Sequence, residues 1–61
     1  MTKTEAGQAV DILKKQDFRE CRDFPSKSLD VGFLVSVTWI DGGKWQSRQF
    51  TDYSEAVKFT I

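Results

Sequence analysis

The clearest pattern of hydrophobic and polar positions lies in residues 31–50, which read VGFLVSVTWI-DGG-KWQSRQF. Two runs rich in β-branched and aromatic residues flank an Asp-Gly-Gly segment, and each run carries a tryptophan near it. Runs of this type that are separated by glycine-containing turn residues indicate a pair of strands joined by a tight turn. This stretch therefore predicts an antiparallel β-hairpin.

The length of the turn decides which side chains of the hairpin share a face. If the two glycines alone formed the turn, Trp39 would pair with Gln46, and core and solvent residues would mix on one face. A three-residue turn with a bulge pairs Trp39 with Trp45 instead, which moves every side chain of the second strand to the opposite face. We predict the three-residue turn because it leaves one apolar face and one mostly polar face. The predicted apolar face consists of Phe33, Val35, Val37, Trp39 and Trp45. The predicted polar face includes Ser36, Thr38, Lys44, Gln46 and Arg48.

The N-terminal residues follow a helical repeat. Apolar side chains recur at the spacing i, i+3, i+4 and i+7, at Ala6, Ala9, Val10 and Leu13. Thr2 and Glu5 are three residues apart, which is the spacing of a capping box at a helix start. An amphipathic helix is therefore expected here, with its apolar stripe against the sheet.

In residues 18–24 (FRECRDF), the apolar side chains follow neither the two-residue period of a strand nor the 3.6-residue period of a helix. A strand is favoured because a lone hairpin is marginally stable without further support, and because Pro25 disfavours helical geometry at the residue before it. The alternative is a continuation of the first helix up to the proline. Residues 25–30 (PSKSLD) are expected to form a loop.

A second helix is expected after the hairpin. Asp52 is the expected N-cap, Glu55 follows three residues later, and Ala56, Val57, Phe59 and Ile61 continue the helix for about two turns. The apolar C-terminal end is expected to dock on its own domain. The sequence thus predicts a small α+β fold over residues 1–61, in the order α-β-β-β-α, in which an N-terminal helix packs on a two- to three-stranded antiparallel sheet and a short C-terminal helix follows.

Charge and composition narrow the classes of function. Nine lysines and arginines balance nine aspartates and glutamates, whereas nucleic-acid binding usually needs a clustered positive face. Cys21 is the only cysteine and there is no histidine, which argues against a disulfide or a zinc site, and no cofactor is expected. We expect a cytoplasmic protein because the sequence offers neither a secretion signal nor an apolar run long enough to span a membrane.

Enzymatic activity is not expected. Without histidine, acid–base chemistry near neutral pH would need a strongly shifted carboxylate, lysine or cysteine. Such shifts require a water-poor pocket, which 61 residues can hardly enclose. Cys21 lies between residues of both charge signs, so a structural thiol is expected there rather than a nucleophile.

Two resemblances bear on the expected fold. The order of elements is similar to that of double-stranded-RNA-binding domains, and residues 42–59 resemble the hairpin and helix that end the arm-type DNA-binding domains of phage integrases. The first family implies a lysine cluster at the start of the last helix, but residues 52–55 read DYSE here and would repel phosphate. The second implies a further strand before the hairpin and more basic residues. In this sequence only Lys44, Arg48 and Lys58 could serve as those basic residues. No functional residue is carried over from either family.

Binding to another protein is the function that these observations favour. We expect a small regulatory or adaptor module, which would suit a phage-encoded or bacterial accessory protein, and its zero net charge would permit a homodimer. The expected partner-binding residues are Lys44, Gln46, Arg48 and Tyr53. The alternative is a module that binds single-stranded nucleic acid by stacking bases on Trp39 or Trp45, with Lys44 and Arg48 at the phosphates. That alternative needs exposed indoles, which the predicted register would bury.

Overall fold

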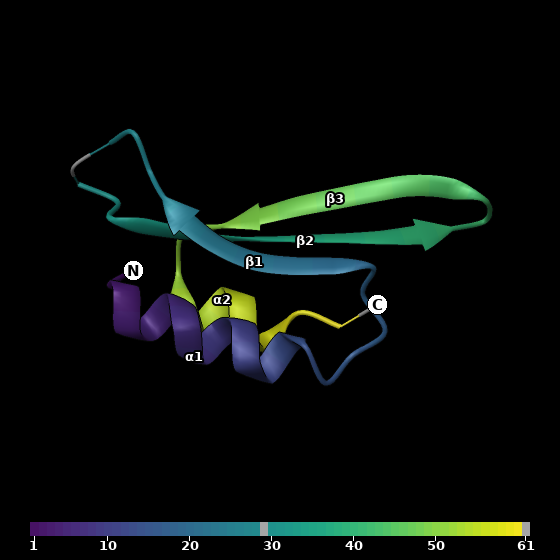
Figure 1. Cartoon of the computed structure of the whole chain (residues 1–61), viewed down its shortest axis with the longest axis horizontal. Coiled ribbons are helices and arrows are strands. Elements are labelled where there is room, and N and C mark those ends of the chain that lie inside the picture. Colours follow the sequence, from purple (N-terminus) through teal and green to yellow (C-terminus); the bar gives the residue numbers. More distant parts are fainter. Residues whose placement is uncertain (29, 61) are drawn as a thin grey trace.

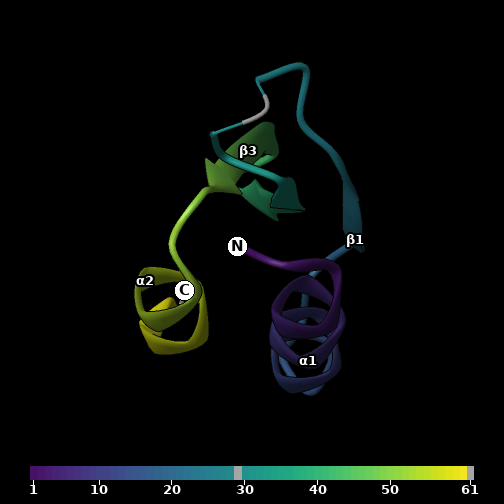
Figure 2. The ribbon, with the colours of Figure 1, turned by 90° about the vertical axis from the view of Figure 1, so that its left-hand side faces the viewer.

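A computed structural model describes residues 1–28 and 30–60. Its elements are α1 (Lys3–Leu13), β1 (Glu20–Pro25), β2 (Phe33–Asp41), β3 (Lys44–Phe50) and α2 (Tyr53–Lys58). The strands form one antiparallel sheet in the order β1-β2-β3. Both helices lie on the same side of this sheet (Figures 1 and 2). The predicted α+β fold and its order of elements are confirmed.

Helix α1 begins with the predicted capping box. The Thr2 hydroxyl accepts a hydrogen bond from the Glu5 backbone N–H (3.1 Å), and the Glu5 carboxylate accepts one from the Thr2 backbone N–H (2.9 Å). The hydrogen bond from the Thr2 backbone is the main reason that the pKa of Glu5 is lowered, since it stabilises the ionised carboxylate. The buried face of α1 consists of the predicted residues Ala6, Ala9, Val10 and Leu13.

The segment between α1 and the hairpin forms a strand, which confirms the favoured prediction for residues 18–24 over the helical alternative. Strand β1 starts at Glu20, two residues later than expected, and extends through Pro25, which the sequence had placed in a loop. It pairs with β2 so that Cys21 lies opposite Val37. Leu29, in the middle of the expected loop, lies outside the described residues.

The predicted register of the hairpin is wrong. Trp39 pairs with Gln46, and Val37 pairs with Arg48, which is the register of the two-residue turn. Gly42 and Gly43 both have positive φ angles (59° and 81°). A type I′ turn requires positive φ at both central residues, and its twist matches that of the flanking strands. The two glycines therefore form the whole turn, without the bulge that the three-residue turn would need.

The side chains of β3 consequently lie on the faces opposite to those predicted. Gln46, Arg48 and Phe50 share the helix-facing side with Trp39, while Trp45 lies on the other side. Polar residues are tolerated on the helix-facing side because the hairpin extends past the ends of both helices, so that Gln46 and Arg48 stay exposed (Figure 1).

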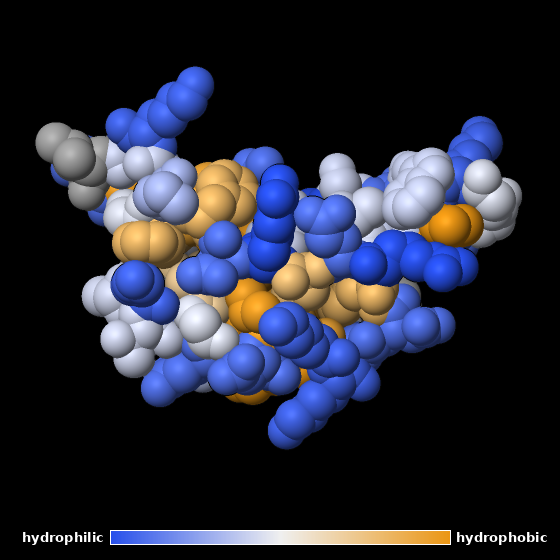
Figure 3. Space-filling view, in the orientation of Figure 1, coloured by the Kyte–Doolittle hydropathy of each residue, from blue (hydrophilic) through white to orange (hydrophobic). Residues whose placement is uncertain are grey.

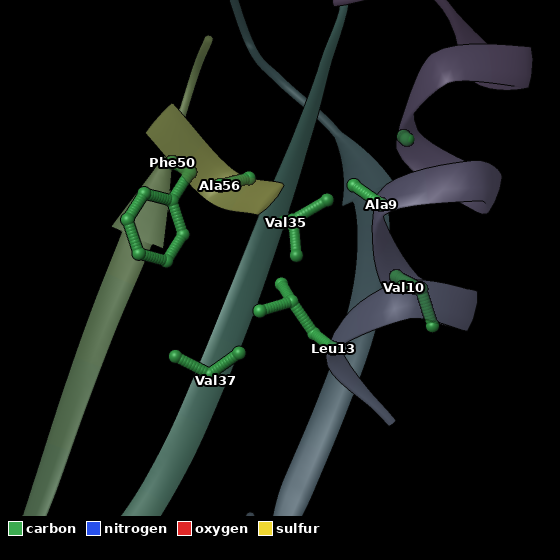
Figure 4. Close-up of a cluster of buried hydrophobic side chains, with 8 residues drawn as sticks. Ala9, Val10, Leu13, Val35, Val37, Phe50 and Ala56 are labelled. Carbon is green, nitrogen blue, oxygen red and sulfur yellow. The ribbon is translucent and has the colours of Figure 1, made fainter. Parts of the chain in front are cut away.

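The hydrophobic core lies between the sheet and the two helices (Figure 4). Its buried members are Ala6, Ala9, Val10, Leu13, Val35, Val37, Phe50 and Ala56. Leu13 reaches from α1 toward Val35 and Val37 of the central strand, which closes the middle of the core.

Helix α2 is shorter than predicted. The Asp52 carboxylate caps it by accepting a hydrogen bond from the Ser54 backbone N–H (3.1 Å), as expected. The helix ends at Lys58, and Phe59 is extended with ψ 126°. Phe59 packs against the core, which confirms that this part of the apolar end docks on its own domain. Ile61 lies outside the described residues.

Candidate functional site

The far end of the β2–β3 hairpin projects away from the rest of the fold (Figure 1). Ile40 and Trp45 are cross-strand partners at this end. Their exposed fractions are 41% and 67%, so they are large hydrophobic residues that the domain itself does not cover. Both side chains lie on the side of the sheet away from the helices, because Val37 and Trp39 alternate with them toward the helical side.

We call this side of the sheet the open face. By strand register it carries Glu20, Arg22, Phe24, Leu34, Ser36, Thr38, Ile40, Trp45, Ser47 and Gln49. Its two charged members form an ion pair, in which Arg22 Nε lies 3.2 Å from Glu20 Oε1. A space-filling view from the side of β1, which includes the helices, shows a hydrophobic group near the tip of the hairpin among hydrophilic residues (Figure 3). The open face is therefore close to neutral and mixed in polarity.

The predicted partner-binding residues lie elsewhere. Lys44, Gln46 and Arg48 form a row along β3, on the helix-facing side rather than on the open face. The Arg48 guanidinium carbon lies 5.2 Å from the ring centroids of both Phe50 and Phe59, so this side chain also packs on the core. Tyr53 belongs to α2 and is half-buried, which separates it from the strand row in the fold.

Sequence reasoning missed the exposure of Trp45 and its pairing with Ile40. A signal was present in the adjacent glycines, because a Gly-Gly pair between two strands suits a two-residue turn with positive φ at both positions. The gathering of apolar residues on one face favours the other register, so the two signals conflict in this sequence. The turn geometry decided the register and brought the indole of Trp45 out to solvent.

A second feature of the hairpin lies on its helix-facing side, where aromatic rings gather. Phe59 stacks on Phe18 (centroids 5.8 Å apart, 12° between planes) and lies 5.3 Å from Trp39 and 5.2 Å from Phe50. The Gln16 side-chain amide donates a hydrogen bond to the Phe59 carbonyl (3.0 Å), which holds the chain after α2 in place.

An open pocket of about 600 Å³ adjoins these rings. It is lined by Asp17, Trp39, Ile40, Asp41, Phe59 and Thr60. Trp39, Asp41 and Phe59 place most of it beneath the projecting hairpin, on the helix-facing side, but Ile40, the cross-strand partner of Trp45, lines it too. Its lining combines two aromatic residues with two acidic ones.

Other chemistry is sparse among the described residues. Burial raises the pKa of the half-buried Cys21 thiol, and its sulfur lies 4.0 Å from the Val10 carbonyl oxygen. A raised pKa makes the reactive thiolate scarcer. Over residues 1–28 and 30–60, no cluster of side chains could hold a metal ion. Neither helix in this part of the chain has the length and apolar character to cross a membrane.

No protein-family model, curated protein or solved structure matches this chain. The functional proposal therefore depends on the surface of the molecule itself.

Proposed function

We propose that this protein is a non-enzymatic regulatory or adaptor module that binds another protein through the open face, with Trp45 and Ile40 at the centre of the contact. The observation that carries the proposal is the 67% exposure of the Trp45 side chain beside Ile40 on a paired strand. Tryptophan is among the residues most enriched at the energetic centres of protein interfaces. Leaving such a ring in water forgoes about 25 cal/mol of stabilisation for each Å² that a partner would bury.

The rest of the open face suits the rim of such an interface. Ser47 and Gln49 follow Trp45 at every second position of β3, where they can make hydrogen bonds around the apolar centre. Because Trp45 sits on a strand that is paired with β2, its backbone is held before binding, and less conformational entropy is lost on contact.

The charge of the open face favours a protein over a nucleic acid. Binding to phosphates releases counterions and requires several unpaired cations on one surface. By register, Arg22 is the basic residue among the described members of the open face, and Glu20 already pairs with it. Nucleic acid remains the alternative because the exposed Trp45 provides a stacking platform, although Lys44 and Arg48 lie on the opposite face. We place the interaction in the cytoplasm of a bacterium or of a phage-infected cell.

Replacing Trp45 by serine is expected to abolish capture of the partner while the fold persists. The chain should be immobilised as wild type, as Trp45→Ser and as Ile12→Ser, and captured proteins from the source cells should be quantified by mass spectrometry. Ile12 is a matched control, since it is a 37% exposed hydrophobic residue on α1. The proposal predicts a protein that wild type and Ile12→Ser retain and that Trp45→Ser loses.

Equal capture by all three proteins would contradict the role of Trp45. Titration with a single-stranded oligonucleotide distinguishes the alternative. The titration uses the Trp39→Phe protein, in which Trp45 is the remaining tryptophan. Strong quenching of its fluorescence that weakens steeply with salt would favour nucleic acid.

A further inference from the structure

The pocket beneath the hairpin has the chemistry of a site for a guanidinium group. Asp17 and Asp41 line it together with Trp39 and Phe59. Aspartate is ordinarily ionised at neutral pH, and aromatic rings attract cations through the negative charge of their faces. We propose that this pocket binds an arginine side chain of another polypeptide.

Two cations of the chain itself lie near this pocket. Arg48 already places its guanidinium carbon 5.2 Å from the Phe59 centroid, so an outside cation would meet mainly the two aspartates and Trp39. Among the described residues, the one ion pair joins Arg22 and Glu20, so neither Asp17 nor Asp41 has a partner there. Lys44 is the cross-strand neighbour of Asp41 on the same face, without an ion pair to it. Its ammonium group competes weakly with an incoming ligand, because exposed ion pairs contribute about 0–1 kcal/mol.

Size and shape agree with an arginine side chain. A volume of about 600 Å³ falls within the usual range for ligand pockets, roughly 300 to 1,000 Å³. The guanidinium group is planar, so it stacks on an aromatic ring and can pair with a carboxylate through two hydrogen bonds. The apolar stem of arginine suits the aromatic part of the lining. Lysine offers a compact ammonium without these planar contacts and is expected to bind less well.

The ligand is assigned to a polypeptide rather than to free arginine on electrostatic grounds. Free arginine carries an α-carboxylate, which the two lining aspartates would repel, whereas a residue within a chain has no such charge. The inference goes beyond the proposed contact through Trp45, because most of the pocket lies on the opposite side of the hairpin. The two sites share Ile40, and the aspartates of the pocket and Trp45 of the open face distinguish them.

Nuclear magnetic resonance titration of the whole chain tests this site. The probe is the blocked tripeptide acetyl-Ala-Arg-Ala-amide, and its control contains citrulline, a neutral isostere of arginine. Saturable shifts are expected at the amides of Asp17, Asp41 and Thr60 and at the indole N–H of Trp39. Asp17→Asn and Asp41→Asn should each weaken binding by roughly two- to five-fold, as an exposed ion pair implies.

Three controls make the result decisive. Asp11→Asn removes the same charge from the exposed surface of α1 and should leave the affinity unchanged. Lys44→Gln should bind as well as wild type or better, because a competing cation is removed. Trp45→Ser should bind the peptide normally, which separates this site from the proposed contact on the open face.

The inference is overturned if no saturable shifts occur, if the citrulline peptide binds equally, or if the two aspartate variants bind like wild type. Tighter binding of free arginine than of the tripeptide would overturn the assignment to a polypeptide and indicate a small-molecule site.

Discussion

Replacing Leu13 by alanine is expected to remove a large part of the protein's free energy of unfolding. Leu13 is fully buried, and it fills the space between α1 and the central strand (Figure 4). Truncation of a buried leucine costs about 2 to 5 kcal/mol, because apolar contacts are lost and a cavity remains. Small domains are stable by only about 5 kcal/mol, so one such loss removes much of the margin.

Chemical denaturation followed by circular dichroism measures this effect as a free energy of unfolding. The matched control is Ile12→Ala on the same helix, where the side chain is 37% exposed and the expected cost is much smaller. A Leu13→Ala protein as stable as Ile12→Ala would contradict the placement of Leu13 at the centre of the core.

The second large effect is expected for Phe59→Ala, at about 3 kcal/mol, which is the low end for a truncated phenylalanine because this ring is only partly buried. The Phe59 ring contacts Phe18, Trp39 and Phe50, and the Arg48 guanidinium carbon lies 5.2 Å from its centroid. Removing this ring takes one packing contact from each of these neighbours. It also loosens the chain after α2 and increases the exposure of Trp39.

Thermal unfolding together with tryptophan fluorescence measures both consequences. Phe59→Ala should lower the melting temperature. In a Trp45→Phe background, where Trp39 is the remaining tryptophan, it should also shift the emission to the red. Phe24→Ala is the control, since Phe24 is a half-buried phenylalanine of the open face, and a smaller loss is expected there. A native melting temperature for Phe59→Ala would show that the aromatic cluster contributes little.

The sequence predicted those parts of the fold that depend on local chemistry. Thr2, Glu5 and Asp52 cap their helices as expected, because a cap needs only a side chain and the backbone amides a few residues away. The buried stripe of α1 followed from the helical repeat. The end of α2 was harder to predict from the sequence, because it depends on tertiary contacts. Phe59 adopts an extended conformation and packs against the core instead of continuing the helix.

The candidate site was predicted less well, because it depends on a register that differs by a single residue. With the two-glycine turn, Trp45 leaves the helix-facing side and Arg48 enters it. The expectation that apolar residues share one face of the hairpin was wrong. The hairpin extends past both helices, so the helices cannot cover such a face along its full length. The pocket beneath the hairpin could not be foreseen either, since its lining residues come from three separate stretches of the chain.

The most direct test of this account measures the two tryptophans separately, as Trp39→Phe and Trp45→Phe proteins, by fluorescence emission and acrylamide quenching. In Trp39→Phe, the remaining Trp45 should emit at long wavelength and be quenched readily, because its indole faces water. In Trp45→Phe, the remaining Trp39 should emit at shorter wavelength and resist quenching, because it packs on Phe18 and Phe59. Blue-shifted, protected emission from Trp45 in the isolated monomer would contradict the two-residue turn and, with it, the open face that we propose as the binding surface.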